Sequence, residues 1–189
     1  IELEKSYRQK DDKFIDVLDN FRKGRDLEDS VDWINAWCLK ERFEIDSSLT
    51  LTATNKAADK YNREKFDSIK EPLMTYRGDI DGDFHLKGQK LPAPLDLNLK
   101  VGAQVMIVKN TPSAENGTIC RILDLSSNTI QVERLDDNRV FSVVRSEWKQ
   151  IEYKLDPKRF IIETAVVGTY KQFPMMLGWA ITVHKSQGL

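Results

Sequence analysis

The C-terminal end of the chain brings together side chains that bind phosphate groups well. It reads Trp179-Ala180-Ile181-Thr182-Val183-His184-Lys185-Ser186-Gln187-Gly188-Leu189. Hydroxyl, imidazole, ammonium and amide groups at a junction between helix and loop can donate hydrogen bonds to phosphate oxygens, and backbone N–H groups beside a glycine can join them. A polar helix end that simply faces water fits the same residues equally well. The segment is therefore a candidate phosphate-binding site.

Near the other end of the chain, Arg8 has a side chain that could bind phosphate, although the residues alone do not single it out. It lies in the run Leu3-Glu4-Lys5-Ser6-Tyr7-Arg8-Gln9. A fixed guanidinium can form two charge-assisted hydrogen bonds to phosphate oxygens and stabilise the charge that develops in phosphoryl transfer, whereas a lysine lacks this fork of donors. Taken alone, Arg8 is more simply explained as a surface arginine in a polar stretch.

Another candidate is the segment Leu51-Thr52-Ala53-Thr54-Asn55. The residues before Thr54 are typical of a strand, and Thr54 or Asn55 then caps a helix. A hydroxyl and an amide at a helix N-terminus also suit a phosphate, because unpaired N–H groups gather there. Ordinary capping and a phosphate contact use different atoms, so both roles are open.

The sequence predicts no metal site. His85 has no ligand partner at metal spacing, and the two cysteines, Cys38 and Cys120, are far apart in the sequence. The alternating Asp79, Asp81 and Asp83 lack the glutamate that closes a calcium loop. We interpret that stretch as a solvated turn.

The elements that must position these candidates alternate between helix and strand. We expect a helix capped at Asp11 or Asp12 that ends at Gly24, and a second from Asp29 or Ser30 to Cys38. A strand over residues 49–52 and a helix after Thr54 follow. This order indicates an α/β architecture.

The second half of the chain differs in composition and in the length of its expected elements. Glycine, proline and aspartate at 70–96 predict connecting loops, and short strands follow at Val101–Val108, Thr118–Leu123, Thr129–Leu135 and Arg139–Val144. Such closely spaced strands favour a small barrel of the SH3 type. A last strand over Phe160–Val167 then leads to a helix expected from Met175 to Gln187, with Pro174 in its first turn and Gly188 at its end.

The order of the C-terminal residues resembles a known motif. Thr182-x-His184-Lys185-Ser186-Gln187-Gly188 is similar to the fifth conserved motif of superfamily 1 helicases, in the branch of the PIF-type and RecD-like enzymes. Residues 3–9 resemble the fourth motif of that family, and residues 51–55 with Tyr61-Asn62 resemble its L-T-x-T-N segment. Residues 99–106 and 116–118 resemble the start of its SH3-like insert, and residues 168–174 resemble the lead-in to its fifth motif.

The resemblance implies a role for each matched residue. Thr54, Asn55, Thr182, His184, Lys185 and Ser186 would contact single-stranded DNA, Gln187 and Gly188 would approach ATP, and Arg8 would be a catalytic and nucleotide-binding residue. The implied fold is the second RecA-like lobe of a P-loop NTPase-type motor, incomplete and interrupted by a small SH3-like β-barrel. Its segments would be 1–98 and 158–189 for the lobe, truncated after the fifth motif, and 99–157 for the barrel.

The chain departs from the family pattern because half of a motor is missing. It contains no phosphate-binding loop of the form G-x-x-x-x-G-K-S/T and no acidic metal-binding pair, both of which the first lobe carries. We therefore expect ATP and Mg²⁺ to serve the full-length protein, with neither bound to this piece, which alone should not hydrolyse ATP. Its partners would be single-stranded DNA and the first RecA-like lobe. Since the chain starts at Ile1, we expect it to be part of a longer protein.

Composition adds a few limits. The net charge of −1 gives no overall basic signal for nucleic-acid binding, although residues 139–189 carry eight Lys/Arg against four Asp/Glu. The two cysteines suit a reducing cytoplasm, and no apolar run reaches the roughly 20 residues that span a bilayer. A stand-alone nucleic-acid or protein interaction module and a non-hydrolysing, helicase-like structural protein stay open as alternatives. The pathway and the preferred DNA structure stay open too, and the 5′ to 3′ direction is implied by the resemblance only.

Overall fold

A computed structural model describes residues 11–38, 49–84, 91–156 and 161–186, and the chain divides into two compact units, Ile1–Asp46 and Ser47–Leu189. Arg8 of the predicted site lies outside the described residues, as do Gln187 and Gly188.

The first unit contains two helices, α1 (Asp12–Lys23) and α2 (Leu27–Cys38). Asp11 caps α1 by accepting a hydrogen bond from the Phe14 N–H at 3.0 Å. Gly24 ends α1 with a φ of 65°, a left-handed conformation that glycine adopts without steric cost. The predicted start and end of this helix are therefore confirmed.

The second unit begins with a small α/β arrangement. Strand β1 (Thr50–Thr52) pairs in parallel with β12 (Ala180–Thr182), and α3 (Asn55–Ser68) packs against β12. The short helix α4 (Val183–Ser186) follows β12 directly. Thr54 is the N-cap of α3, as the sequence predicts. A parallel pair needs a crossover connection, which here includes every element between β1 and β12.

The largest sheet of the second unit has five antiparallel strands. Its strand order is β11-β5-β6-β7-β8. The strands are β5 (Gln104–Ile107), β6 (Ile119–Leu125), β7 (Ile130–Arg134), β8 (Val140–Val143) and β11 (Met175–Leu177). The four predicted strands between residues 101 and 144 are confirmed. Among the described residues the sheets do not close on themselves, so the SH3-like barrel is not confirmed.

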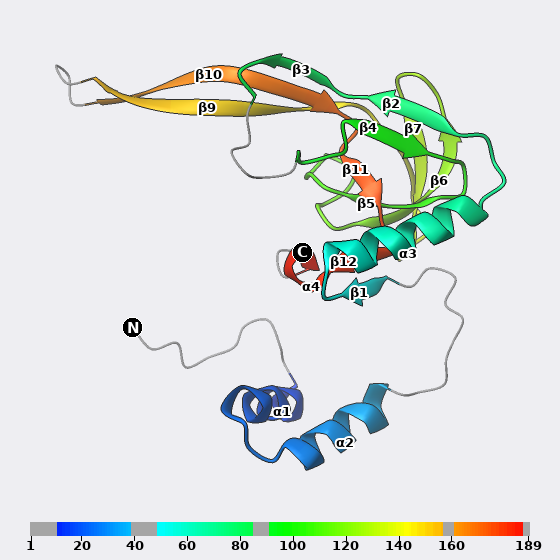
Figure 1. The fold of residues 1–189 in the computed structure, drawn as a ribbon, viewed down its shortest axis with the longest axis vertical. Helices are drawn as coiled ribbons and strands as arrows, with labels where there is room; N and C mark the ends of the chain where they lie inside the picture. Colours follow the sequence, from blue (N-terminus) through cyan, green and yellow to red (C-terminus); the bar gives the residue numbers. More distant parts are fainter. Residues whose placement is uncertain (1–10, 39–48, 85–90, 157–160, 187–189) are drawn as a thin grey trace. The chain divides into compact units, whose positions relative to one another are not determined.

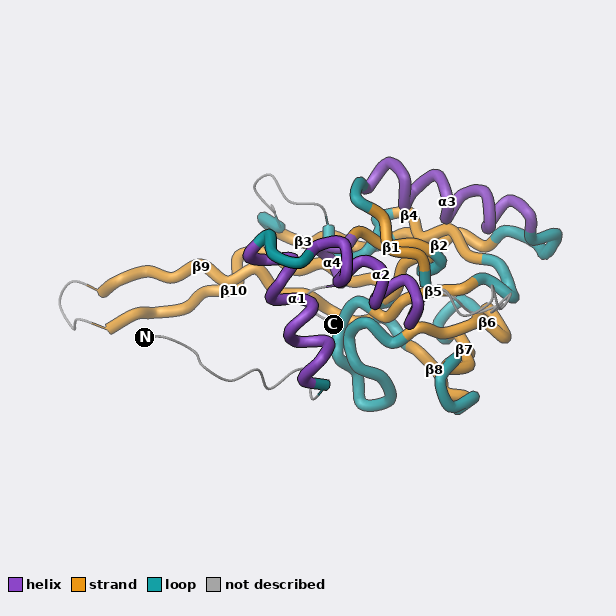
Figure 2. The backbone as a smooth tube through the Cα atoms, turned by 90° about the horizontal axis from the view of Figure 1, so that it is seen from below, coloured by secondary structure: helices purple, strands orange, loops and turns teal. Residues whose placement is uncertain are grey.

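A long two-stranded arm extends from the second unit. It is formed by β9 (Ser146–Asp156) and β10 (Ile161–Gln172), and β3 (Asp79–Gly82) pairs with β10 only from Gly168 to Lys171. Both views show the outer part of the arm as a ribbon of β9 and β10 alone (Figures 1 and 2). A separate pair, β2 (Met74–Arg77) with β4 (Asp96–Leu99), lies beside the five-stranded sheet (Figure 1).

The main hydrophobic core contains residues from the segments before and after the predicted insert, together with residues of the insert itself. The ring of Tyr76 meets that of Phe173 edge to face, with centroids 4.8 Å apart. Both residues belong to one buried cluster with Val105, Ile122 and Val132 of the five-stranded sheet. Each fully buried side chain of this kind contributes roughly 1.5–3 kcal/mol by leaving water. The strands at 74–77 and 175–177 are therefore held by the same core as residues 104–143.

Two predictions are wrong. The helix expected from Met175 to Gln187 is replaced by β11, β12 and the single turn α4. Its apolar spacing suited a helix, but the backbone of 175–177 finds partners on β5 and that of 180–182 on β1, so tertiary pairing overrides the local pattern. The loops expected at 70–96 contain the strands β2 and β3 and the start of β4.

Candidate functional site

The parallel pairing of β1 with β12 brings two predicted DNA-binding segments to one edge. Thr52 lies opposite Thr182 in the register of this pair. Because parallel strands end at the same edge of a sheet, the residues that follow each strand lie close together. They are Thr54 and Asn55 at the start of α3, and Val183 to Ser186 in α4. We call this group, with Thr182, the β1/β12 edge.

On the α3 side of the edge, the backbone is tightly organised. The Thr54 hydroxyl oxygen accepts a hydrogen bond from the Ala57 N–H at 3.2 Å, which is the capping role. The Thr52 hydroxyl lies 3.1 Å from the Thr54 carbonyl oxygen and 3.3 Å from that of Ile181, so it links the two strand ends. Capping uses the Thr54 oxygen as an acceptor and leaves its O–H group to donate. The N–H groups of the first turn of α3 add further donors, as at any helix start.

On the β12 side, the predicted residues differ in accessibility. Thr182 is buried, with 7% of its surface exposed, whereas His184 is exposed. The Ser186 hydroxyl donates to the Val183 carbonyl at 2.7 Å, so its hydrogen stabilises α4 while its oxygen can still accept. The placement of the Lys185 side chain is outside what the structure describes. His184 is therefore the described side chain on this strand end that is most open to a ligand.

The position of β12 depends on a residue to which sequence analysis gave no role. Asn62 is buried on α3, one helical turn after Ala58. Its amide oxygen accepts hydrogen bonds from the N–H groups of Trp179 (3.0 Å) and Ala180 (2.8 Å), and its amide nitrogen donates to the Ala180 carbonyl (2.8 Å). The signal in the sequence was a polar residue on the apolar face of an amphipathic helix.

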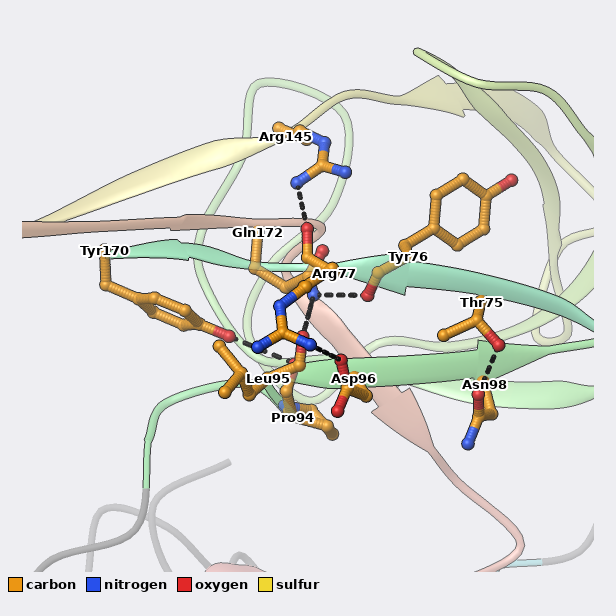
Figure 3. A network of polar contacts seen from close by, with 10 residues as sticks. All are labelled: Thr75, Tyr76, Arg77, Pro94, Leu95, Asp96, Asn98, Arg145, Tyr170 and Gln172. Atoms are coloured by element: carbon orange, nitrogen blue, oxygen red, sulfur yellow. Dashed lines mark hydrogen bonds and ion pairs between the residues drawn. The ribbon is translucent and has the colours of Figure 1, made fainter. Parts of the chain in front are cut away.

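A second buried amide lies at the base of the arm (Figure 3). The Gln172 amide nitrogen lies within 2.9–3.1 Å of the carbonyl oxygens of Tyr76, Pro94 and Leu95, and its oxygen accepts from the Phe173 N–H at 2.9 Å. The neighbouring Tyr170 hydroxyl lies 3.0 Å from the carbonyl oxygens of Ala93 and Pro94, and burial raises the pKa of Tyr170 to about 12. This network joins the end of β10 to β2 and to the segment before β4.

Three basic side chains between residues 145 and 154 have acidic neighbours. Lys149 pairs with Glu147 at 3.6 Å, Lys154 with Glu152 at 3.3 Å, and Arg145 with Asp79 at 3.6 Å. These pairs are exposed or half-exposed and contribute little stability. They reduce the basic character that the count of charges at 139–189 indicates.

Neither a cluster of metal ligands nor a membrane-spanning helix is found in the part of the chain that the structure describes. No group of three His, Cys, Asp or Glu side chains there could hold a metal ion. No helix there is long and apolar enough to cross a membrane.

Comparison with known proteins gives relatives of one kind. No model of a known protein family matches the chain. It is 30% identical over 194 aligned residues to an ATP-dependent DNA helicase Pif1 from Bdellovibrio bacteriovorus, covering 98% of this chain and 41% of that protein. It is 32% identical over 136 residues to PIF1 of Candida albicans, covering 66% and 15% respectively.

Comparison with solved structures also gives Pif1 helicases. The fold matches Pif1 from Bacteroides in complex with ADP-AlF4 at a TM-score of 0.82 and 31% identity, covering 98% of this chain and 42% of that one. Bacteroides Pif1 bound to single-stranded DNA matches at a TM-score of 0.68 and 31% identity, with the same coverage of both chains. The chain thus spans less than half the length of the relatives and structures that it matches.

Proposed function

We propose, from a likeness to Pif1-type helicases that extends over nearly the whole chain, that this chain is part of an ATP-dependent DNA helicase. The resemblance seen in the motifs is confirmed by these relatives and structures. We assign to the chain the contacts with single-stranded DNA and the second-lobe side of the ATP cleft. Translocation from 5′ to 3′ is part of the proposal by resemblance alone.

The observation that carries the proposal is the convergence at the β1/β12 edge. Thr54 and Asn55 are more than 120 positions from Thr182 and His184 in the sequence, yet β1 and β12 end side by side. Hydroxyl, amide, imidazole and backbone N–H groups at such an edge suit the phosphates of a DNA strand, and contacts of this kind position DNA without reading its sequence. Lys185 and Ser186 complete the set that we propose for DNA, with the Ser186 hydroxyl turning its hydrogen from the Val183 carbonyl to a phosphate oxygen.

The nucleotide side of the proposal rests on Arg8, Gln187 and Gly188. Arg8 would reach the terminal phosphate of ATP and stabilise its developing charge, and Gln187 with Gly188 would approach the nucleotide from the end of α4. By the same resemblance, Mg²⁺ would bind with the ATP phosphates and the acidic pair of the first lobe. ATP binding would close the two lobes and hydrolysis would reopen them, which alternates the grip on DNA.

We further propose that the lobe, residues 1–98 and 158–189, is interrupted by an SH3-like insert at 99–157. The antiparallel order β5-β6-β7-β8 supports an insert made of short strands, to which β11 of the lobe segment adds an edge strand. Because its core includes Tyr76 and Phe173, the insert would be held firmly by the segments on either side.

The test is a titration of the full-length protein with fluorescently labelled oligo(dT), followed by anisotropy. The double substitution Thr182→Ala with His184→Ala should weaken binding at least tenfold, since each lost charge-assisted or hydroxyl contact contributes about 1–3 kcal/mol. Thr75→Ala removes an exposed hydroxyl from β2 and should leave the affinity unchanged. Unchanged binding in the double variant would favour the rival function, an interaction module that binds through the insert.

A further inference from the structure

Buried amides gather along one continuous segment, residues 172–180. Among the described residues the buried polar side chains are Ser30, Asn62, Gln104, Gln172 and Thr182. Gln172 begins the segment, the Gln104 amide nitrogen donates to the Gly178 carbonyl at 2.9 Å, and Asn62 bonds the backbone of Trp179 and Ala180. Burying an amide is favourable only when its hydrogen bonds are made, and such bonds fix direction as well as distance. The backbone that leads to Thr182 is therefore held by directed contacts.

Asn62 makes the contact nearest to the β1/β12 edge. Its three hydrogen bonds, 2.8–3.0 Å long, all go to the backbone of residues 179 and 180, just where β12 starts. The Trp179 carbonyl in turn accepts from the Thr50 N–H at 2.8 Å, where β1 starts. Asn62 belongs to α3, the helix that Thr54 caps. One side chain thus ties the helix on one side of the edge to the strand on the other.

Thr52 and Gln104 also hold the backbone near β12, and Asn62 is the contact that fixes the start of β12 relative to α3. Strands β1 and β12 are three residues long, and their pairing alone allows a slip that would turn Thr182 to the opposite face. An apolar residue at position 62 would pack against β12 without fixing its position along the strand. The amide instead recognises one N–H pair and one carbonyl, which selects a single register.

We propose that Asn62 is a positioning residue for DNA binding: it acts through the backbone of Trp179 and Ala180 to hold Thr182 and His184 beside Thr54 and Asn55. This inference rests on the proposed function, because it assigns DNA binding to those four residues. Asn62 itself is buried and would not touch DNA.

The test is a double-mutant cycle in the full-length protein, read out as affinity for labelled oligo(dT). Asn62→Ala should weaken binding at least tenfold in the natural background. In the background of Thr182→Ala with His184→Ala, the same substitution should cost less than threefold, because the groups that it positions are already gone. Val132→Ala serves as the control, since it creates a cavity on β7, which pairs with β6 and β8 and takes no part in the Asn62 hydrogen bonds, and it should change the affinity less than threefold in both backgrounds.

The outcomes separate the inference from the proposed function. If Thr182→Ala with His184→Ala has no effect on DNA affinity, the proposed function fails and the inference with it. If that variant is defective but Asn62→Ala binds normally, or if Asn62→Ala costs the same factor in both backgrounds, only the positioning role is refuted. If Asn62→Ala does not fold, Asn62→Asp replaces it in the cycle, because it keeps the acceptor for both N–H groups and loses the donor to Ala180. The same non-additivity is then expected.

Discussion

Replacing Gln172 by leucine should lower the stability of the second unit substantially, because it removes a set of buried hydrogen bonds. Gln172 is fully buried, and its amide reaches three carbonyl oxygens and one N–H group. Leucine has a similar volume, so the substitution leaves little cavity and mainly removes hydrogen bonds. The arm of β9 and β10 would lose the hydrogen bonds that fix its base to β2 and to residues 94–95.

The expected loss of stability depends on which hydrogen bonds each partner of Gln172 keeps after the substitution. The Pro94 carbonyl retains the Tyr170 hydroxyl and the Leu95 carbonyl retains the Gly78 N–H, so these two are not left unpaired. The Phe173 N–H loses its Gln172 partner, which costs about 1–3 kcal/mol for a buried donor. The Gln172 amide nitrogen has two hydrogens, so at most two full bonds to the carbonyls are lost; at about 0.5–1 kcal/mol each, they bring the total to about 2–5 kcal/mol.

Thermal unfolding followed by circular dichroism measures this loss. At roughly 3 °C per kcal/mol for a chain of this size, Tm should fall by about 6–15 °C. Gln131→Leu makes the same exchange at an exposed position on β7 and should shift Tm by less than about 2 °C. Equal shifts for the two variants would show that the Gln172 network is not what holds the arm, and the reasoning from buried amides would be wrong.

Three further predictions follow from single sites. Thr54→Ala removes the N-cap of α3 and should lower the free energy of unfolding by about 1 kcal/mol in urea titrations, whereas Thr54→Ser should cost little. Gly178→Ala should disrupt the β11–β5 pairing, since the added Cβ would lie 2.7 Å from backbone atoms of Val105 and Met106. Amide hydrogen exchange at residues 175–177 should therefore be faster than in the natural protein. Exchange at the natural rate would contradict this close packing. Burial raises the pKa of Cys120 from its ordinary value of 9.0 to about 12, so its contribution to stability should be complete below pH 9 and lost as pH rises toward 12. At pH 8 iodoacetamide should modify the Cys120 peptide only in urea, and rapid modification of the folded chain would refute the burial.

The sequence predicts the local features of this fold well where capping chemistry is strong. Asp11, Gly24 and Thr54 mark helix ends as expected, because side-chain hydrogen bonds and glycine geometry depend on neighbours only a few residues away. The short strands between 101 and 144 are also predicted, since turn formers separate them.

The C-terminal segment could not be predicted correctly from local signals. Met176, Ala180 and Val183 have helical spacing, but residues 175–177 and 180–182 find their hydrogen-bond partners on strands distant in the sequence. The motif resemblance identified which residues gather at the β1/β12 edge, and it did not reveal how they are held. The roles of Asn62 and Gln172 are visible only once the backbone atoms that they bond are placed.

The central claim is that the β1/β12 edge binds DNA, and amide hydrogen exchange of the full-length protein with and without oligo(dT) tests it most directly. We predict that DNA slows exchange at residues 53–57 and 182–186 together, because both segments would contact the same strand. Slower exchange confined to residues 104–143, with both edge segments unchanged, would contradict the claim and locate DNA binding on the five-stranded sheet instead.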